Sequence, residues 1–318
     1  MLSGSDEHGT PITVTADETG KSPQAVVDEN HDAIFASLVE LGCSWGQTLD
    51  RRGVEFGGAL YGRTSDPRHH ELVQDILLEL HENGFLIQET MEQFCSVADD
   101  GGIKFLPDRY VQGVCPACSA EGARGDQCDA CGATYEANEL KDPVSKLNPE
   151  IPVEIRETDH LFFRLDLLQE DLETHAASRR STWKPNVRAM TQNWLNMGLR
   201  PRAVTRDIEW GVKIPLDDEV WGEKRVYVWF DAVQGYLTCA RIWSERIAEE
   251  SGSESDIWRR WWMDSGNLRH IYFMGKDNIP FHTIIWPGIL MALNRGREDH
   301  ERLHLEDNVA SNEYLMLS

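Results

Sequence analysis

Residues 270–287 read HIYFMGKDNIPFHTIIWP, and this stretch decides the fold class. Its first five residues form an apolar run that predicts a buried β-strand. A Gly-Lys-Asp turn follows at 275–277, and a helix is predicted over 281–293. A strand, a turn and a helix in this order are typical of parallel α/β sheets, whose ligands sit at the carboxyl ends of the strands. The sequence therefore predicts an α/β fold, with Lys276 and nearby backbone N–H groups placed to meet phosphate.

A second apolar run, VYVWF at 226–230, also suits a buried parallel strand. Aromatic and small side chains alternate through it, so Trp229 and Tyr236 are candidates for the walls of an apolar pocket. Ordinary core packing is the alternative, because large aromatic residues are usually buried. His282 and Trp286 are four residues apart and therefore share one face of the predicted helix.

Residues 3–12, SGSDEHGTPI, place Asp6, Glu7 and His8 directly before Gly9. If the residues ahead of them end a strand, these side chains lie at its carboxyl end, where ligands bind in α/β sheets. A carboxylate at that point can bind an ammonium group. The alternative is an acidic turn with a solvated histidine.

Four cysteines stand in two Cys-x-x-Cys pairs, and these are Cys115, Cys118, Cys128 and Cys131. Two intervening residues let both sulfurs of a pair point the same way, and two pairs can enclose Zn²⁺ with Zn–S distances of ~2.3 Å. The spacing predicts one structural zinc ion, with disulfides or ordinary thiols as the alternative. The remaining three cysteines stand alone, which fits a reducing cytoplasm better than a disulfide framework.

The chain is strongly acidic, with 54 acidic and 31 basic residues and a formal net charge of −23. We interpret this charge, together with 23 Arg against 8 Lys, as adaptation to a cytoplasm of high salt. An acidic surface that meets a basic partner is the alternative. The charge argues against nucleic-acid affinity over the whole surface, but it leaves local basic clusters at 179–188 and 200–206. Neither an apolar run near ~20 residues nor a secretory signal is present, so no membrane association is expected.

Capping residues and periodicity outline the other elements. The sequence predicts helices over 22–41 and 68–83, a loop or short hairpin over 53–68, a helix-rich stretch over 166–198 and a polar loop over 249–256.

Five ordered blocks of the chain resemble the methionyl-tRNA synthetases, a family of class I aminoacyl-tRNA synthetases. The blocks are SGSDEHGTPI, FLPDRYVQGVCPAC with GDQCDACGATY, AVTRDIEWG, VYVWFDAVQGY and IYFMGKDNIPFHTIIWPGIL. The resemblance implies a Rossmann-like parallel sheet that is split by a zinc-bearing connective domain. It assigns 1–90 and 206–318 to the two parts of the catalytic domain, and 91–205 to the connective domain with its knuckle at 115–131.

By matching motif, the resemblance also implies site residues. Methionine would be held at its ammonium group by Asp6 and along its side chain by Trp229, Ala232, Val233, Tyr236, Asn278 and His282, with Trp286 behind them. ATP or the adenylate would lie along His8, Gly9, Gly275, Lys276 and Asp277, and the catalytic phosphate contacts would come from Lys276, Asp277 and Arg206. The four cysteines would hold the zinc. Val233 and Gln234 stand where Pro and Ile are commoner in the family, which bears on the shape of the pocket.

The implied activity is ATP- and Mg²⁺-dependent activation of methionine and its transfer to tRNA(Met) in the cytoplasm. Two family signatures, a His-x-Gly-His element and a Lys-Met-Ser-Lys-Ser loop, do not occur in the sequence. We therefore expect the core of a longer enzyme, without its first βα unit and inactive by itself. The alternatives are a non-catalytic remnant of a synthetase gene and a related class I synthetase for Ile, Val, Leu or Cys.

Overall fold

The computed structural model describes residues 2–43, 60–97, 103–106, 110–125, 128, 130–131, 135, 137–146, 148–252, 255–263 and 268–313. Two pairs of parallel strands carry the α/β part of the fold. Strand β1 (Leu2–Ser5) pairs with β2 (Leu60–Arg63), and β12 (Ile271–Gly275) pairs with β13 (Asn308–Asn312). Both pairs join strands that are distant in sequence, which confirms the predicted α/β class.

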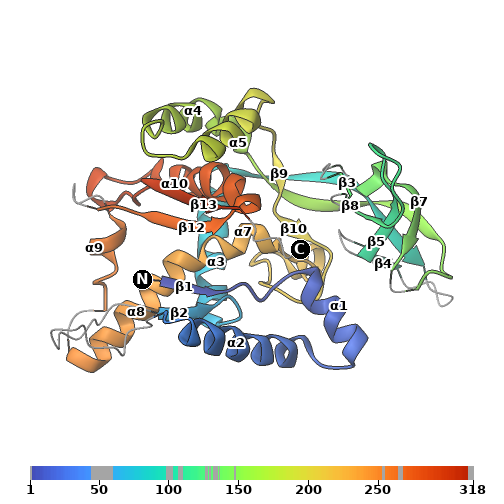
Figure 1. Cartoon of the computed structure of the whole chain (residues 1–318), viewed down its shortest axis with the longest axis horizontal. Helices are drawn as coiled ribbons and strands as arrows, with labels where there is room; N and C mark the ends of the chain where they lie inside the picture. Colours follow the sequence, from blue (N-terminus) through green and yellow to red (C-terminus); the bar gives the residue numbers. More distant parts are fainter. Residues whose placement is uncertain are drawn as a thin grey trace.

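Helices surround these strand pairs (Figure 1). The longer ones are α1 (Thr10–Thr19), α2 (Pro23–Glu40), α3 (Pro67–Glu82), α4 (Gln169–Ser178), α5 (Pro185–Asn196), α8 (Gly235–Ser251) and α10 (Trp286–Asn294). Short helices are α6 (Asp218–Trp221), α7 (Val228–Ala232) and α9 (Arg259–Trp262), and a π-helical turn spans Phe281–Ile285. Single 3₁₀ turns span Ala137–Glu139, Leu165–Leu168, Lys276–Asn278 and Asp299–Glu301. In Figure 1, α4 and α5 lie above β12 and β13, while α2 lies below β1 and β2.

An antiparallel arm projects from the α/β part (Figure 1). Its larger sheet has the order β4-β3-β8-β9, formed by Ile103–Phe105, Leu86–Val97, Val153–Phe163 and Arg202–Ala203. Its smaller sheet has the order β6-β5-β7, formed by Ala123–Arg124, Val111–Val114 and Lys141–Ser145. A further antiparallel pair, β10 (Thr205–Arg206) and β11 (Arg225–Val226), leads the chain back to the α/β part.

Local sequence signals place several helices where they were predicted. The Ser22 hydroxyl accepts a hydrogen bond from the N–H of Ala25 at 3.2 Å and thereby caps α2. Asp66 caps α3 in the same way by accepting from the N–H of Arg68. Gly198 follows α5 with a φ of 77°, a left-handed conformation that suits glycine. The predicted helices at 22–41 and 68–83 and the helix-rich stretch at 166–198 are confirmed.

The predicted strand at 226–230 is wrong, because only Val226 belongs to β11 and the helix α7 begins at Val228. The N–H of Phe230 donates to the carbonyl of Tyr227 at 2.8 Å, which closes the first helical turn. A short buried apolar run has the same composition in a strand and in a helix, so periodicity could not separate the two.

Three smaller expectations also change. Within 53–68, residues 53–59 lie outside the described residues, and 60–63 form a parallel strand rather than part of a hairpin. The predicted polar loop at 249–256 begins inside α8, and its residues 253–254 are not described. Strand β12 exists as predicted but is not buried throughout, since Phe273 is 75% exposed. No helix among the described residues is both long enough and apolar enough to cross a bilayer.

Candidate functional site

The loop that follows β1 forms one side of the candidate site. Asp6 faces outward, whereas His8 is buried. Gly9 has a φ of 89°, and a Cβ atom on it would meet Val228 at 3.0 Å. Glycine at this position therefore lets the loop lie directly against α7. The predicted strand ahead of this loop is confirmed, and the alternative of a solvated His8 is excluded.

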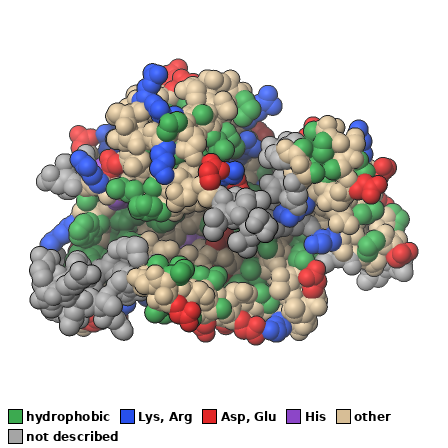
Figure 2. All heavy atoms as spheres, viewed as in Figure 1, with side chains coloured by type: hydrophobic (Ala, Val, Ile, Leu, Met, Phe, Trp, Pro, Cys, Tyr) green, Lys and Arg blue, Asp and Glu red, His purple; other side chains and the backbone are tan. Residues whose placement is uncertain are grey.

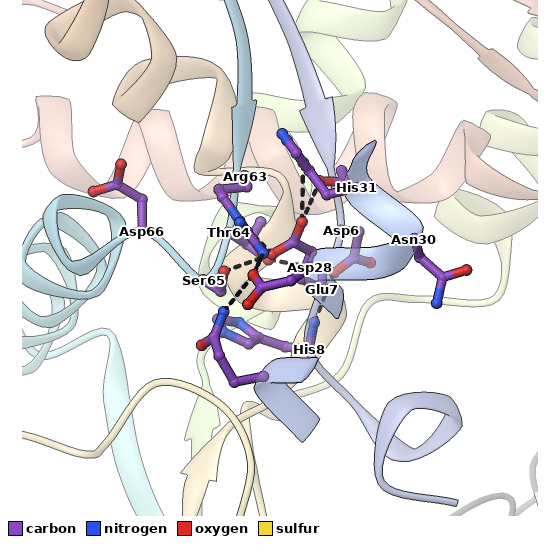
Figure 3. Close-up of polar contacts among 12 residues, drawn as sticks. Asp6, Glu7, His8, Asp28, Asn30, His31, Arg63, Thr64, Ser65 and Asp66 are labelled. Atoms are coloured by element: carbon purple, nitrogen blue, oxygen red, sulfur yellow. Dashed lines mark hydrogen bonds and ion pairs between the residues drawn. The ribbon is translucent and has the colours of Figure 1, made fainter. Parts of the chain in front are cut away.

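Glu7 points away from Asp6 and fixes the loop from behind (Figure 3). Its carboxylate accepts hydrogen bonds from Ser5 and Ser65 at 2.5 Å and from Arg63 Nε at 2.8 Å. His31 Nδ1 lies 3.1 Å from the same carboxylate. Because Arg63 neutralises Glu7, the carboxylate left to face a ligand is that of Asp6.

A buried ion pair joins the β1 loop to α7. His8 Nδ1 lies 2.8 Å from Asp231 Oδ2, and both side chains are almost fully buried. Burial by itself lowers the pKa of His8, but the Asp231 carboxylate outweighs this and raises it. Burial also raises the pKa of Asp231. Both shifts favour a proton held on the pair. Asp231, in the WFDA stretch at 229–232, is a polar residue of the site that the sequence analysis did not identify.

Asp6 lies within the electrostatic reach of this pair. Its side chain is open to the solvent, but the protein atoms that crowd it and the Asp231 carboxylate raise the pKa of Asp6 to about 7. The charge of His8 acts in the opposite direction and lowers it. The ionisation of Asp6 near neutral pH therefore depends on its neighbours.

Aromatic side chains from α7, α8 and the π-helical turn form the other side of the site. The Trp229 ring stacks on Phe281 with 4.6 Å between centroids and 16° between planes. Tyr236 donates from its hydroxyl to His282 Nε2 at 2.7 Å, and its ring lies 4.6 Å from that of Tyr272. Two distant segments, 228–236 and 281–285, are thus in direct contact. That Trp229, Tyr236 and His282 bind an amino acid stays a prediction.

The remaining residues assigned to the amino-acid pocket surround this group. Ala232 is half-buried on α7, Val233 is buried next to it, and Asn278 accepts from His282 Nδ1 through its carbonyl at 2.9 Å. Trp286 is fully buried and donates from Nε1 to the hydroxyl of Tyr272 at 3.1 Å. Trp286 therefore lies behind the aromatic wall and not on it. Figure 2 shows hydrophobic and histidine side chains inside a hollow between the elements above and below.

The residues expected near phosphate fall in two places. Gly275 ends β12, and Lys276 Nζ makes an ion pair with Glu313 at 2.8 Å, while Asp277 is exposed. Arg206 lies instead in β10, where its guanidinium sits 3.9 Å from the centroid of the Tyr227 ring. The structure does not show these residues around one phosphate position, so their roles stay predictions.

Arg206 lines a groove of about 660 Å³ between the arm and α7, and Trp229 and Phe281 line it too. Two further arginines, Arg200 and Arg202, lie on its wall. Arg202 stacks over Trp194 at 4.8 Å. No described residue that lines this groove is Asp or Glu, although the whole chain has an excess of 23 acidic charges.

The four cysteines of the arm gather into one cluster. All four Sγ atoms lie within 4.8 Å of one another. Cys115 and Cys131 are 3.9 Å apart, and Cys118 and Cys128 are 3.7 Å apart. A tetrahedral Zn²⁺ with Zn–S bonds of ~2.3 Å separates its sulfurs by roughly 3.8 Å. The geometry fits one structural zinc ion and excludes disulfides, because all four cysteines are free.

Comparison with known proteins gives one consistent result. The family model described as tRNA synthetases class I (M) matches residues 1–318. The chain is 42% identical to a methionine–tRNA ligase of Chlorobaculum tepidum over 314 residues, which covers 99% of this chain and 41% of that protein. It is 44% identical to a methionine–tRNA ligase of Nocardioides over 328 residues, covering all of this chain and 51% of that protein.

Solved structures agree in fold. A methionyl-tRNA synthetase of Mycobacterium tuberculosis bound by methionyl-adenylate superposes with a TM-score of 0.61 at 22% identity, covering 99% of this chain and 49% of the other. The chain thus spans about half the length of the relatives that it matches. Since the family model covers every residue and the identity to these relatives exceeds 40%, the chain belongs to the class I tRNA synthetases of the methionine group.

Proposed function

We propose that this chain forms the amino-acid-binding core of a methionine–tRNA ligase. The observation that carries the proposal is the meeting of three segments that are distant in sequence: the β1 loop contacts α7 through His8 and Asp231, and α7 contacts the π-helical turn through Trp229 and Phe281. The resulting site has a carboxylate at one side and aromatic rings at the other. An amino acid with an ammonium group and a long apolar side chain fits this distribution.

The polarity of the site favours a thioether side chain. Sulfur in a thioether makes favourable contacts with aromatic rings, worth ~0.3–1.5 kcal/mol each. Tyr236 and Tyr272, which contact His282, and Trp229, which stacks on Phe281, supply such rings. Branched side chains such as those of Leu and Ile lack the polarizable sulfur and differ in shape from methionine. The 42–44% identity to proteins named methionine–tRNA ligase supports the same choice.

The reaction of the full-length enzyme then has two steps. The methionine carboxylate attacks the α-phosphorus of ATP·Mg²⁺ and displaces pyrophosphate, which leaves methionyl-adenylate. A ribose hydroxyl at the 3′ end of tRNA next attacks the adenylate carbonyl, loses its proton and displaces AMP. In the described part of the chain, Asp6 orients the ammonium group and the aromatic wall fixes the side chain, so the carboxylate is held in place for attack.

The groove between the arm and α7 is the candidate site for the second substrate, tRNA. Three arginines and several aromatic rings line it, and it shares Trp229 and Phe281 with the amino-acid site. Arginines that meet phosphates, combined with rings that stack on bases, are typical of surfaces that bind single-stranded nucleic acid. We therefore assign this groove to the unpaired 3′ end of tRNA.

Calorimetry tests the amino-acid site. We expect the purified chain, in a buffer of high salt, to bind methionine at least about tenfold more tightly than leucine or isoleucine, because pocket fit alone discriminates by 10–200-fold. Asp6→Asn removes the charge that meets the ammonium group and abolishes binding. Asp32→Asn makes the same change of charge on the exposed face of α2 and leaves binding intact. Equal heats for methionine and leucine would refute the proposal.

A further inference from the structure

A second histidine continues the His8–Asp231 pair toward α3. His70, on the first turns of that helix, has its Nε2 atom 3.2 Å from Nε2 of His8. The two rings meet edge to face, with centroids 5.1 Å apart at 62°. Since His8 Nδ1 is engaged by Asp231 at 2.8 Å, the three side chains form one line of hydrogen bonds from α3 through the β1 loop to α7.

His8 is the centre of a larger group of titratable side chains. The groups that face it are Asp6 and Glu7 from its own loop, His69 and His70 from the start of α3, and Asp231 from α7, while Asp66 acts on the two histidines of that helix start. The edge of the Trp210 ring completes the enclosure at 5.9 Å. Arg63 is paired with Glu7, and Asp66 is paired with Arg68, so neither of these carboxylates needs the charge of His8.

The two histidines at the start of α3, His69 and His70, are neutral at physiological pH. Burial, followed by the charge of His8, lowers the pKa of His69 to about 3 and that of His70 to about 4. His69 also bonds Thr238 through Nδ1 at 2.8 Å. A neutral His70 can accept the Nε2 proton of a charged His8, and hydrogen bonding to the charged form favours that form.

The charge of His8 opposes the burial and the Asp231 carboxylate that raise the pKa of Asp6. When His8 is charged, it neutralises Asp231, and among the described carboxylates around His8 only Asp6 is then left without a basic partner. When His8 is neutral, Asp231 repels the charge of Asp6, whose pKa rises further because His8 no longer lowers it. A proton lost from His8 therefore favours a proton gained by Asp6, and a protonated Asp6 cannot pair with an ammonium group.

We infer that His70 is a positioning residue of the amino-acid site: its hydrogen bond holds the proton on His8, and this keeps the Asp6 carboxylate ionised for the ammonium group of the substrate. The inference rests on the proposed function for the identity of the ligand. The part that concerns His8 and Asp6 can be measured without any ligand.

Two variants at this position separate hydrogen bonding from packing. His70→Leu removes the acceptor and keeps an apolar side chain at the same place. His70→Gln keeps a carbonyl oxygen that can accept from His8, so it is the conservative variant. His81→Gln on the exposed end of the same helix is the control for loss of a histidine from α3.

NMR titration of the side chains gives the direct readout. In His70→Leu we expect the midpoint of His8 to fall by about one pH unit, the lower end of the range for loss of a specific partner, and the midpoint of Asp6 to rise. His70→Gln and His81→Gln should titrate like the unmodified chain. Unchanged midpoints in His70→Leu would overturn the inference, whether or not methionine binds.

Methionine affinity measured from pH 5.5 to 9 supplies the second readout. Affinity falls as the pH drops through the Asp6 titration, and in His70→Leu this acidic limb should move to higher pH while affinity at pH 9 stays the same. A loss of equal size at every pH would show a purely structural role and contradict the inference. If the unmodified chain binds no methionine at any pH, the proposed function fails, and the NMR midpoints still decide the role of His70.

Discussion

Tyr236 donates a hydrogen bond from its hydroxyl to Nε2 of His282 across 2.7 Å. The Nδ1 proton of the same imidazole is accepted by the carbonyl of Asn278 at 2.9 Å. Burial lowers the pKa of His282 to about 4, so the ring is neutral at physiological pH. Its two partners fix both its tautomer and its orientation. The pair therefore places a polar group of fixed geometry among the aromatic rings of the site.

Tyr236→Phe tests this pair. The substitution keeps the ring but leaves His282 Nε2 buried without a donor, which costs ~1–3 kcal/mol for an unsatisfied buried group. We expect a loss of unfolding free energy of that size in urea titrations. Calorimetry should also show methionine affinity falling by about tenfold, because 1.4 kcal/mol corresponds to one decade. Affinity and stability equal to those of the unmodified chain would show that the hydrogen bond does not organise the site.

The buried neutral histidines make stability depend on pH. His69 and His282 have pKa values lowered to about 3 and about 4 in the folded chain, against about 6.5 when unfolded. Between pH 6.5 and 4 the unfolded state binds more protons, so the unfolding free energy falls as the pH is lowered. Each histidine contributes at most about 1.4 kcal/mol per pH unit in that window.

Urea titrations at several pH values measure this slope. His69→Gln keeps a group that can bond Thr238 and removes one titrating ring, so its stability should change less steeply between pH 6.5 and 4. His300→Gln, at an exposed position, should leave the slope unchanged. An identical slope in His69→Gln and in the unmodified chain would mean that His69 is not buried as a neutral ring.

The cysteine cluster predicts one zinc ion per chain. Elemental analysis of protein purified under reducing conditions should find a Zn:chain ratio near one. Cys118→Ser should lower this ratio and make the arm around 110–146 sensitive to protease, because a structural zinc site supplies the folding energy of a small polar segment. Cys43→Ser, remote in sequence from the cluster, should retain the metal. A chain that stays protease-resistant after complete removal of zinc would contradict the structural role.

The arginine-lined groove predicts a salt-dependent interaction with RNA. A short RNA hairpin with an unpaired 3′ tail should bind more tightly than the same hairpin without the tail. Trp194→Ala should weaken tail binding by ~1–3 kcal/mol if a base stacks on the ring. Arg202→Gln should reduce the slope of log K against log salt by about one.

Two controls make the RNA experiment specific. Arg260→Gln changes the same charge at an exposed position outside the groove, and it should not alter tail binding. Methionine binding by Trp194→Ala should stay normal, because this residue lies outside the amino-acid site. Equal affinity for the tailed and tailless hairpins would remove the groove from the tRNA path.

Much of the site could be predicted where function follows from local sequence. The turn after β1 and the two Cys-x-x-Cys pairs have short-range spacings that fix their geometry, and both are present as predicted. The alternating aromatic residues made Trp229 a candidate pocket wall, and spacing put His282 on a helix face with Trp286, whereas their roles in binding methionine were implied by the resemblance. The cap at Ser22 identified a helix because the capping oxygen acts within three residues.

The rest depended on contacts between distant residues. Asp231 is 223 positions from His8, and nothing in the local run distinguishes its helix from a strand. The contact of His70 with His8 likewise depends on how α3 packs against the β1 loop, so sequence alone did not predict it. The contact of Arg206 with the Tyr227 ring also depends on how the β10–β11 pair packs. Such residues become informative only when the tertiary packing brings them together.

A crystal structure of the chain grown with methionine is the most direct test of the whole account. We predict that the methionine nitrogen lies within hydrogen-bond distance of Asp6 and that its sulfur lies among Trp229, Tyr236 and His282. Methionine bound elsewhere, or with its sulfur turned toward Asp6, would contradict the account.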